Sequence, residues 1–178
     1  GPVYAIVQGF FLGAFTRLAD YIIAQQGLEV FGGVGLQAFI ITASALLGVL
    51  TLYRARIIRP TRRFQAVLYT ATGAIMLAYI ATFALSFFGL HLPLISVASA
   101  VNDQGAWGLL GLGINLLILV IASLWLVMDF KLVEDTVEQE APKVMEWYCG
   151  FALIVSLAWI YFEAVKLVLR IATLFNEE

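Results

Sequence analysis

The sequence predicts an all-α fold, a polytopic membrane helix bundle with five transmembrane helices, from its composition and from the spacing of its charges. The 178 residues are 62% hydrophobic and 12% charged, and the mean hydropathy is +0.97. Soluble domains are roughly half apolar and about a quarter charged, so the composition excludes that class. Residues 30–53, 64–102 and 104–128 carry no charge, and each gap exceeds the ~20 residues that a helix needs to cross hydrocarbon.

The expected spans, in chain order, are 3–19, 34–53, 64–88, 107–130 and 144–174. Four glycines between residues 27 and 35, and a glycine and a proline within 89–93, indicate loops at the membrane surface after the first and third spans. No repeat or linker divides the chain, so residues 1–178 are expected to form a single transmembrane domain. The sequence begins Gly1-Pro2 without a methionine, and we expect the natural N-terminal part to be missing.

Basic residues concentrate between the second and third spans. This stretch, residues 54–63, is named the arginine loop here, and its arginines are Arg54, Arg56, Arg59, Arg62 and Arg63. Residues 89–106 contain no lysine or arginine, so the positive-inside rule places the arginine loop in the cytoplasm. The turn between the last two spans is then also cytoplasmic, and the C-terminus lies outside. The net charge is −2 and the basic residues form no stripe, which excludes a nucleic-acid binder.

Small residues in the spans indicate packing. Gly9 and Gly13 form a GxxxG motif in the first span, a spacing that lets two helix backbones approach closely in lipid. We expect this motif to pack helices within the chain, with a dimer interface as the alternative. Cys149 is the single cysteine, which excludes a disulfide scaffold, and we expect it to be a packing residue.

Two carboxylates lie within the last two spans, where an ionisable group is usually functional or paired. At 100° per residue, one side of the fourth span collects small and polar residues with an acid among them: Gly111, Asn115, Ala122 and Asp129. One side of the fifth span does the same: Cys149, Ala152, Ser156, Glu163 and Arg170. Both acids are therefore expected to face the interior of the bundle.

Each acid also has a structural interpretation. In the structural interpretation of Asp129, the fourth span ends at this residue, and its carboxylate lies among the cytoplasmic headgroups beside Lys131. Lys166 follows Glu163 by three residues, so a helical ion pair is expected to satisfy that acid locally. A third acid, Glu146, lies near the membrane interface and is not expected to be functional.

No catalytic motif is visible in the sequence. Nothing matches a Ser/His/Asp set, an HExxH pair or a phosphate loop, so we expect neither enzyme activity nor a cofactor. His91 is the single histidine, and no metal site is expected around it.

Four segments carry a resemblance to a known family: 4–13 (YAIVQGFFLG), 128–130 (MDF), 141–148 (APKVMEWY) and 159–167 (WIYFEAVKL). Together they resemble the Bax inhibitor-1/YccA family, part of the transmembrane BAX inhibitor motif superfamily, and in particular its bacterial branch. The resemblance implies a seven-helix fold of which this chain is similar to helices three to seven. It also implies a bacterial cytoplasmic (inner) membrane as the location.

The resemblance further implies a pH-sensitive calcium leak channel. In the family two buried acids on the last two helices share a proton and form the sensor, and by motif these positions are Asp129 and Glu163. Calcium is then the transported ion, with Asn115 as a further oxygen ligand beside the two acids. In a hairpin turning near Glu140, Asp129 lies level with about Ala152, and Glu163 lies about 16 Å further along the helix.

A second function is compatible with the same sequence. YccA-type members are associated with a membrane-bound AAA protease, so the alternative is a non-conducting regulatory protein. It would bind such a protease, or a stress or cell-death partner, through the arginine loop and the acidic turn that follows the fourth span. A proton-coupled transporter is disfavoured because no inverted repeat or broken helix pair is apparent.

Overall fold

The computed structural model contains helices and no strands over the residues that it describes, which are 1–90, 95–102 and 105–175. Its helices are α1 (Pro2–Gln25), α2 (Gly33–Arg54), α3 (Arg62–Ser86), α4 (Val97–Asn102), α5 (Gly105–Glu138) and α6 (Val144–Phe175). All except the short α4 are long and apolar enough to cross a membrane. The predicted polytopic bundle of five spans is therefore confirmed. His91 lies outside the described residues.

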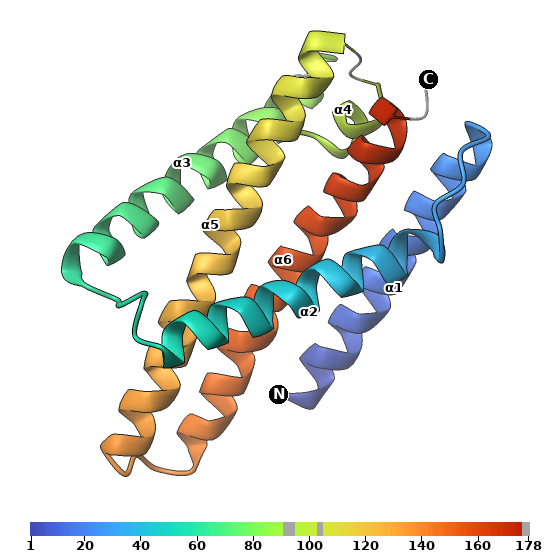
Figure 1. Ribbon diagram of the computed structural model, residues 1–178. Coiled ribbons are helices and arrows are strands. Elements are labelled where there is room, and N and C mark those ends of the chain that lie inside the picture. The colour runs from blue at the N-terminus through green and yellow to red at the C-terminus, as the bar shows by residue number, and fades with distance from the viewer. Residues whose placement is uncertain (91–94, 103–104, 176–178) are drawn as a thin grey trace.

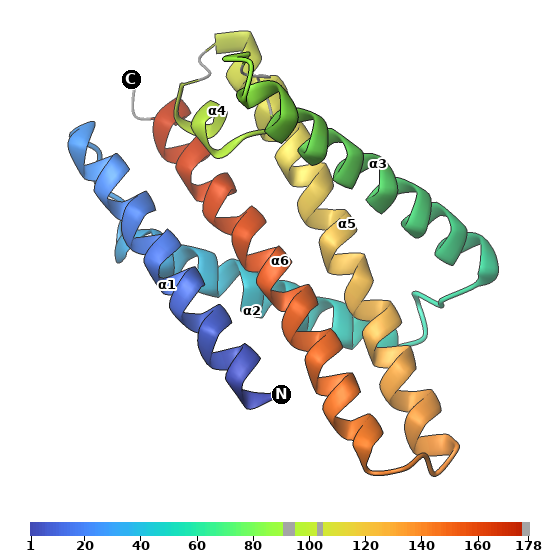
Figure 2. The ribbon, with the colours of Figure 1, turned by 180° about the vertical axis from the view of Figure 1, so that it is seen from behind.

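Helix α6 is the central element of the bundle. It forms an antiparallel hairpin with α5, while α1 lies on one side of this hairpin, α3 lies on the other, and α2 crosses it obliquely (Figure 1). The view from behind shows the same order, with α2 on the far side (Figure 2). Helix α6 contacts α1, α2, α4 and α5. Every residue from 163 to 170 is buried, so polar groups on this part of α6 are enclosed by protein.

Two apolar clusters hold the helices around α6. One joins α1, α2 and α6 through buried residues such as Ile23, Val34 and Leu169. The other joins α2, α5 and α6 through Val49, Leu126 and Ile160. Aromatic and aliphatic side chains elsewhere on α1, α2, α3 and α5 are largely exposed. This distribution is expected in a bilayer, where the lipid-facing surface is as apolar as the core.

Several predicted boundaries are wrong because helices continue past the first charged residue. Helix α5 ends at Glu138 rather than at residue 130, and Lys131 and Asp135 form an ion pair of 3.0 Å across the added turns. With 34 residues, α5 is about 51 Å long, longer than the hydrocarbon core of about 30 Å. The connection that precedes α5, predicted as loop, contains the short helix α4.

Helix α1 also continues beyond its predicted end at residue 19, to Gln25. The additional turns bring Asp20 to the start of α2, where its Oδ1 accepts a hydrogen bond of 2.8 Å from the backbone amide of Val34. The first amides of a helix have no partner within the helix and carry partial positive charge, so a carboxylate stabilises them. Asp20 thus fixes the angle between α1 and α2.

The glycines of the GxxxG motif make no close helix contact within the described chain, and their predicted packing role stays a prediction. A Cβ added at Gly9 or Gly13 would meet nothing within 4 Å. Close approach occurs instead at Gly35, where a Cβ would lie 2.9 Å from Cγ2 of Thr16, and at Gly111, where it would lie 2.1 Å from Nη1 of Arg170. The alternative for Gly9 and Gly13, an interface with a second copy, stays a prediction.

Candidate functional site

Asp129 is buried on α5 at the contact with α6, as the stripe of small residues predicts. Its side chain is enclosed, with 7% of the residue exposed, and Ser156 of α6 lies beside its carboxyl group. Its Oδ2 has no hydrogen-bond partner within the described ranges. The ion pairs of the described residues are Lys131–Asp135 and Lys166–Glu163, so no cation there neutralises Asp129. A carboxyl group in this setting is suited to exchanging a proton or contacting a cation.

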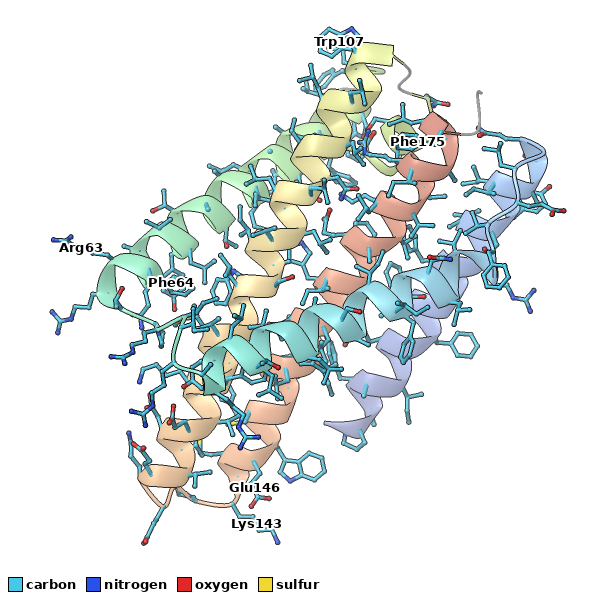
Figure 3. All side chains as sticks on the ribbon, viewed as in Figure 1. Arg63, Phe64, Trp107, Lys143, Glu146 and Phe175 are labelled. Atoms are coloured by element: carbon cyan, nitrogen blue, oxygen red, sulfur yellow. The ribbon has the colours of Figure 1, made fainter. Side chains whose placement is uncertain are left out.

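The position of Asp129 along α5 shows how far it lies from the two ends of the bundle. Trp107 lies near the start of α5, at the opposite end of the bundle from Lys143 and Glu146 (Figure 3). Asp129 follows Trp107 by about 33 Å along the helix at 1.5 Å per residue. This distance is about the thickness of a hydrocarbon core, so Asp129 lies near the end of the bundle that holds Lys143 and Glu146. Helix α5 does not end at Asp129, which is therefore not a helix-terminating residue.

Glu163 belongs to a different polar cluster, deeper in the bundle. The residue is 0% exposed, and its Oε1 accepts a hydrogen bond of 2.5 Å from the Tyr79 hydroxyl of α3. Its Oε2 accepts from Asn115 Nδ2 of α5 at 2.9 Å and lies 3.0 Å from Lys166 Nζ. The predicted local ion pair is confirmed, and both carboxylate oxygens have donors.

Two cations extend this cluster toward α4. Lys166 also donates to the Tyr79 hydroxyl at 2.6 Å and lies 4.9 Å from the centre of the Tyr79 ring. One turn further along α6, Nη2 of Arg170 donates to Oγ of Ser99 at 2.9 Å. The guanidinium of Arg170 occupies the space that the absent side chain of Gly111 leaves on α5. The cluster thus connects α3, α4, α5 and α6 through charged and polar side chains, all of them buried except the partly buried Tyr79.

The two acids do not meet in this structure. Asp129 is opposite Ser156, and Glu163 lies two turns further along α6, a rise of about 10 Å. The directly shared proton that the resemblance implies is therefore not part of this arrangement. The reason is the short connection between Glu138 and Val144, which keeps α5 and α6 in simple antiparallel register. The sequence predicts Asp129 level with about Ala152 and a separation of about 16 Å, so the structure brings the two acids closer by about one helical turn.

Sequence reasoning placed Asn115 beside Asp129 on one stripe, but the structure joins it to Glu163. It also missed Tyr79, because the third span was treated only as apolar, and it missed Ser99. A hydroxyl-bearing Tyr79 in the middle of an otherwise apolar segment was the available signal for the first of them. Ser99 lies in a connection that the sequence predicted as loop.

No group of three or more His, Cys, Asp or Glu residues that could hold a metal ion is present in the described part of the chain. Calcium contact at Asp129 and Glu163 stays a prediction. The five arginines of the arginine loop are exposed, and Cys149 is buried. Glu146 lies beside Lys143 at the end of the α5–α6 hairpin (Figure 3).

The fold and its buried charges define an integral multi-pass membrane protein. The family model described as Bax inhibitor 1 like matches residues 1–173, and the chain belongs to this family. No curated protein and no solved structure matches the chain. The resemblance is thus confirmed at the level of the family, while the YccA subtype and the bacterial branch stay predictions.

Proposed function

We propose that this chain forms a pH-sensitive calcium leak pathway of the YccA type in a bacterial cytoplasmic membrane, with Asp129 as the titrating group of its gate. The observation that carries the proposal is the enclosed Asp129 carboxyl at the α5–α6 contact, which has Ser156 as a neighbour and no ion-pair partner among the described residues. Membership of the Bax inhibitor 1 like family supports it.

The gate follows from the cost of enclosing a charge. A neutral Asp129 is accommodated between α5 and α6 by the Ser156 hydroxyl, whereas an ionised Asp129 requires water or a cation in that contact. Loss of the proton therefore favours separation of the cytoplasmic halves of α5 and α6. Calcium prefers several oxygen ligands, so one carboxylate and one hydroxyl provide a passing contact for the ion rather than a resident site.

Glu163 has a different part in this proposal. Its carboxylate is paired with Lys166, and its oxygens accept hydrogen bonds from Tyr79 and Asn115. Such a cluster holds α3, α5 and α6 together at the level of Glu163 while the Asp129 end opens. The two acids of the sensor thus act at two depths, one as the titrating group and one as the fixed point against which the helices move.

The test is calcium flux into dye-loaded liposomes, measured against pH, for the wild type and Asp129→Asn. Asparagine stays neutral at every pH, so we expect a low flux that no longer rises with pH. Glu146→Gln is the matched control, because it removes an exposed acid from the first turn of α6, and it should retain the wild-type profile. A full wild-type profile in Asp129→Asn would exclude Asp129 as the sensor.

A second candidate is the non-conducting regulator, and the exposure of all five arginines of the arginine loop favours it. In that case no flux is expected at any pH from inserted, folded protein. Co-purification of a membrane-bound AAA protease should then depend on the loop arginines, including Arg62 and Arg63, and not on Asp129. Asp129→Asn, together with a variant of the loop arginines, therefore separates the two functions.

A further inference from the structure

A basic cavity of about 500 Å³ lies where α2 ends, between the arginine loop and α5. Four cationic side chains line it, three from the end of α2 and the loop and one from α5: Arg54, Arg56, Arg59 and Lys131. Glu134 is the single acid among its lining residues. The remaining two loop arginines, Arg62 and Arg63, belong to the start of α3 and do not line the cavity. Arg63 extends away from the bundle (Figure 3).

The cavity holds an excess of positive charge. Glu134 is engaged by the Tyr53 hydroxyl, and Lys131 pairs with Asp135 at 3.0 Å. None of the three cavity arginines forms an ion pair with an acid that the structure describes. Several convergent cations around a concave space, with one engaged acid, form a site for an anion.

The backbone of the loop holds these cations in place. Arg56 has a left-handed φ of 57°, which allows the amide of Ile57 to bond the carbonyl of Leu52 at 3.1 Å and its own amide to bond the carbonyl of Tyr53 at 3.0 Å. Arg59 Nε donates to the Arg56 carbonyl at 3.4 Å. A loop ordered in this way loses little conformational entropy when an anion binds.

The depth of the cavity identifies the anion. Lys131 lies about 36 Å beyond Trp107 along α5. With Trp107 at one edge of a hydrocarbon core of about 30 Å, Lys131 lies about 6 Å past the other edge, within a headgroup layer of about 5–7 Å on each side. The cavity is therefore level with lipid phosphates. Next to it, Leu52 and Ile57 are exposed apolar residues, with 37% and 70% of their surface accessible, and they offer contacts to acyl chains.

We propose that this cavity binds the headgroup phosphate of an anionic phospholipid of the cytoplasmic leaflet. Guanidinium groups bind phosphate oxygens in a bidentate manner. A zwitterionic lipid also has a phosphate, but its ammonium group would be repelled by the surrounding cations, so the site selects lipids with a net negative charge. Basic pockets between transmembrane helices on the cytoplasmic side are suited to such headgroups.

The test compares two double variants that remove the same charge from the same loop. Arg56→Gln/Arg59→Gln changes the cavity, and Arg62→Gln/Arg63→Gln changes loop arginines outside it. Native mass spectrometry of the detergent-solubilised chain counts bound phosphatidylglycerol, with phosphatidylcholine as the neutral lipid. We expect the cavity variant to lose affinity for phosphatidylglycerol by about tenfold or more, because it loses hydrogen bonds between charged groups. The outer variant should stay within about twofold of the wild type.

Three results would overturn the proposal. Equal losses in both double variants would indicate general attraction of basic residues to lipid. Displacement of phosphatidylglycerol by millimolar inorganic phosphate would identify a site for the free ion. Retained lipid binding in the cavity variant, with loss only of a co-purifying protein partner, would identify a protein-docking loop. If Arg56→Gln/Arg59→Gln does not fold, Lys131→Gln replaces it, because Lys131 lines the cavity from α5 and is expected to reduce phosphatidylglycerol binding in the same direction.

Discussion

Glu163→Gln tests the buried cluster directly, because it removes one charge and preserves the volume of the side chain. In the wild type, the carboxylate lies 3.0 Å from Lys166 Nζ, with side chains 0% and 3% exposed. Removing one partner of a buried ion pair typically costs about 3–5 kcal/mol. The amide also presents a donor where Asn115 and Lys166 already donate. We expect the free energy of unfolding to fall by about 3–5 kcal/mol, since Lys166 is left as an uncompensated buried cation.

The matched control is the second ion pair of the described chain. Lys131 and Asp135 are also 3.0 Å apart, but their side chains are 37% and 42% exposed. Exposed pairs contribute about 0–1 kcal/mol, so Asp135→Asn should lower the free energy of unfolding by less than about 1 kcal/mol. Because the two pairs have the same length, the difference between the two variants measures the effect of burial.

The assay is reversible unfolding in mixed detergent micelles, followed by circular dichroism as the fraction of sodium dodecyl sulfate increases. A third variant, Glu163→Gln/Lys166→Met, removes both charges and should recover most of the stability lost in the single variant. Similar, small losses of stability in Glu163→Gln and Asp135→Asn would refute the predicted effect of burial on the ion pair. The prediction is also refuted if the double variant is no more stable than Glu163→Gln, because the loss would then not come from an unpaired Lys166.

Two further stability predictions follow from close contacts. Gly111→Ala should lower the thermal midpoint and reduce the free energy of unfolding by about 1–3 kcal/mol, because the new Cβ would lie 2.1 Å from Nη1 of Arg170. Gly113→Ala is the control and should be tolerated, because a Cβ there meets nothing within 4 Å. Equal losses of stability in the two variants would contradict the contact at Gly111. Asp20→Ala should cost about 0.5–2 kcal/mol by removing the acceptor for Val34, and Asp20→Asn should restore most of it. Failure of asparagine to restore stability in the same unfolding assay would argue against hydrogen bonding at this helix start.

The sequence was sufficient for the helices and for their inner faces. Three long charge-free gaps located the middle spans, and shorter charge-free runs with apolar flanks located the first and last, because a helix that crosses lipid must be predominantly apolar. The 100° count also oriented the last two helices correctly: Gly111, Asn115, Ala122 and Asp129 are buried on α5, and Ser156, Glu163 and Arg170 are buried on α6. Gly9 and Gly13 make no close helix contact in the described chain, because a motif of small residues permits close approach without requiring it.

What the sequence by itself determined is therefore local: composition and periodicity specify which segments cross the membrane and which side of each faces protein. Only the tertiary structure decided which polar residues meet, placing Asn115 with Glu163, Tyr79 with Lys166, and Asp129 beside Ser156. The physical reason is that polar contacts between helices depend on axial register and crossing angle. Those are determined by the length of the α5–α6 connection and by packing across the bundle, neither of which leaves a periodic signal in the sequence.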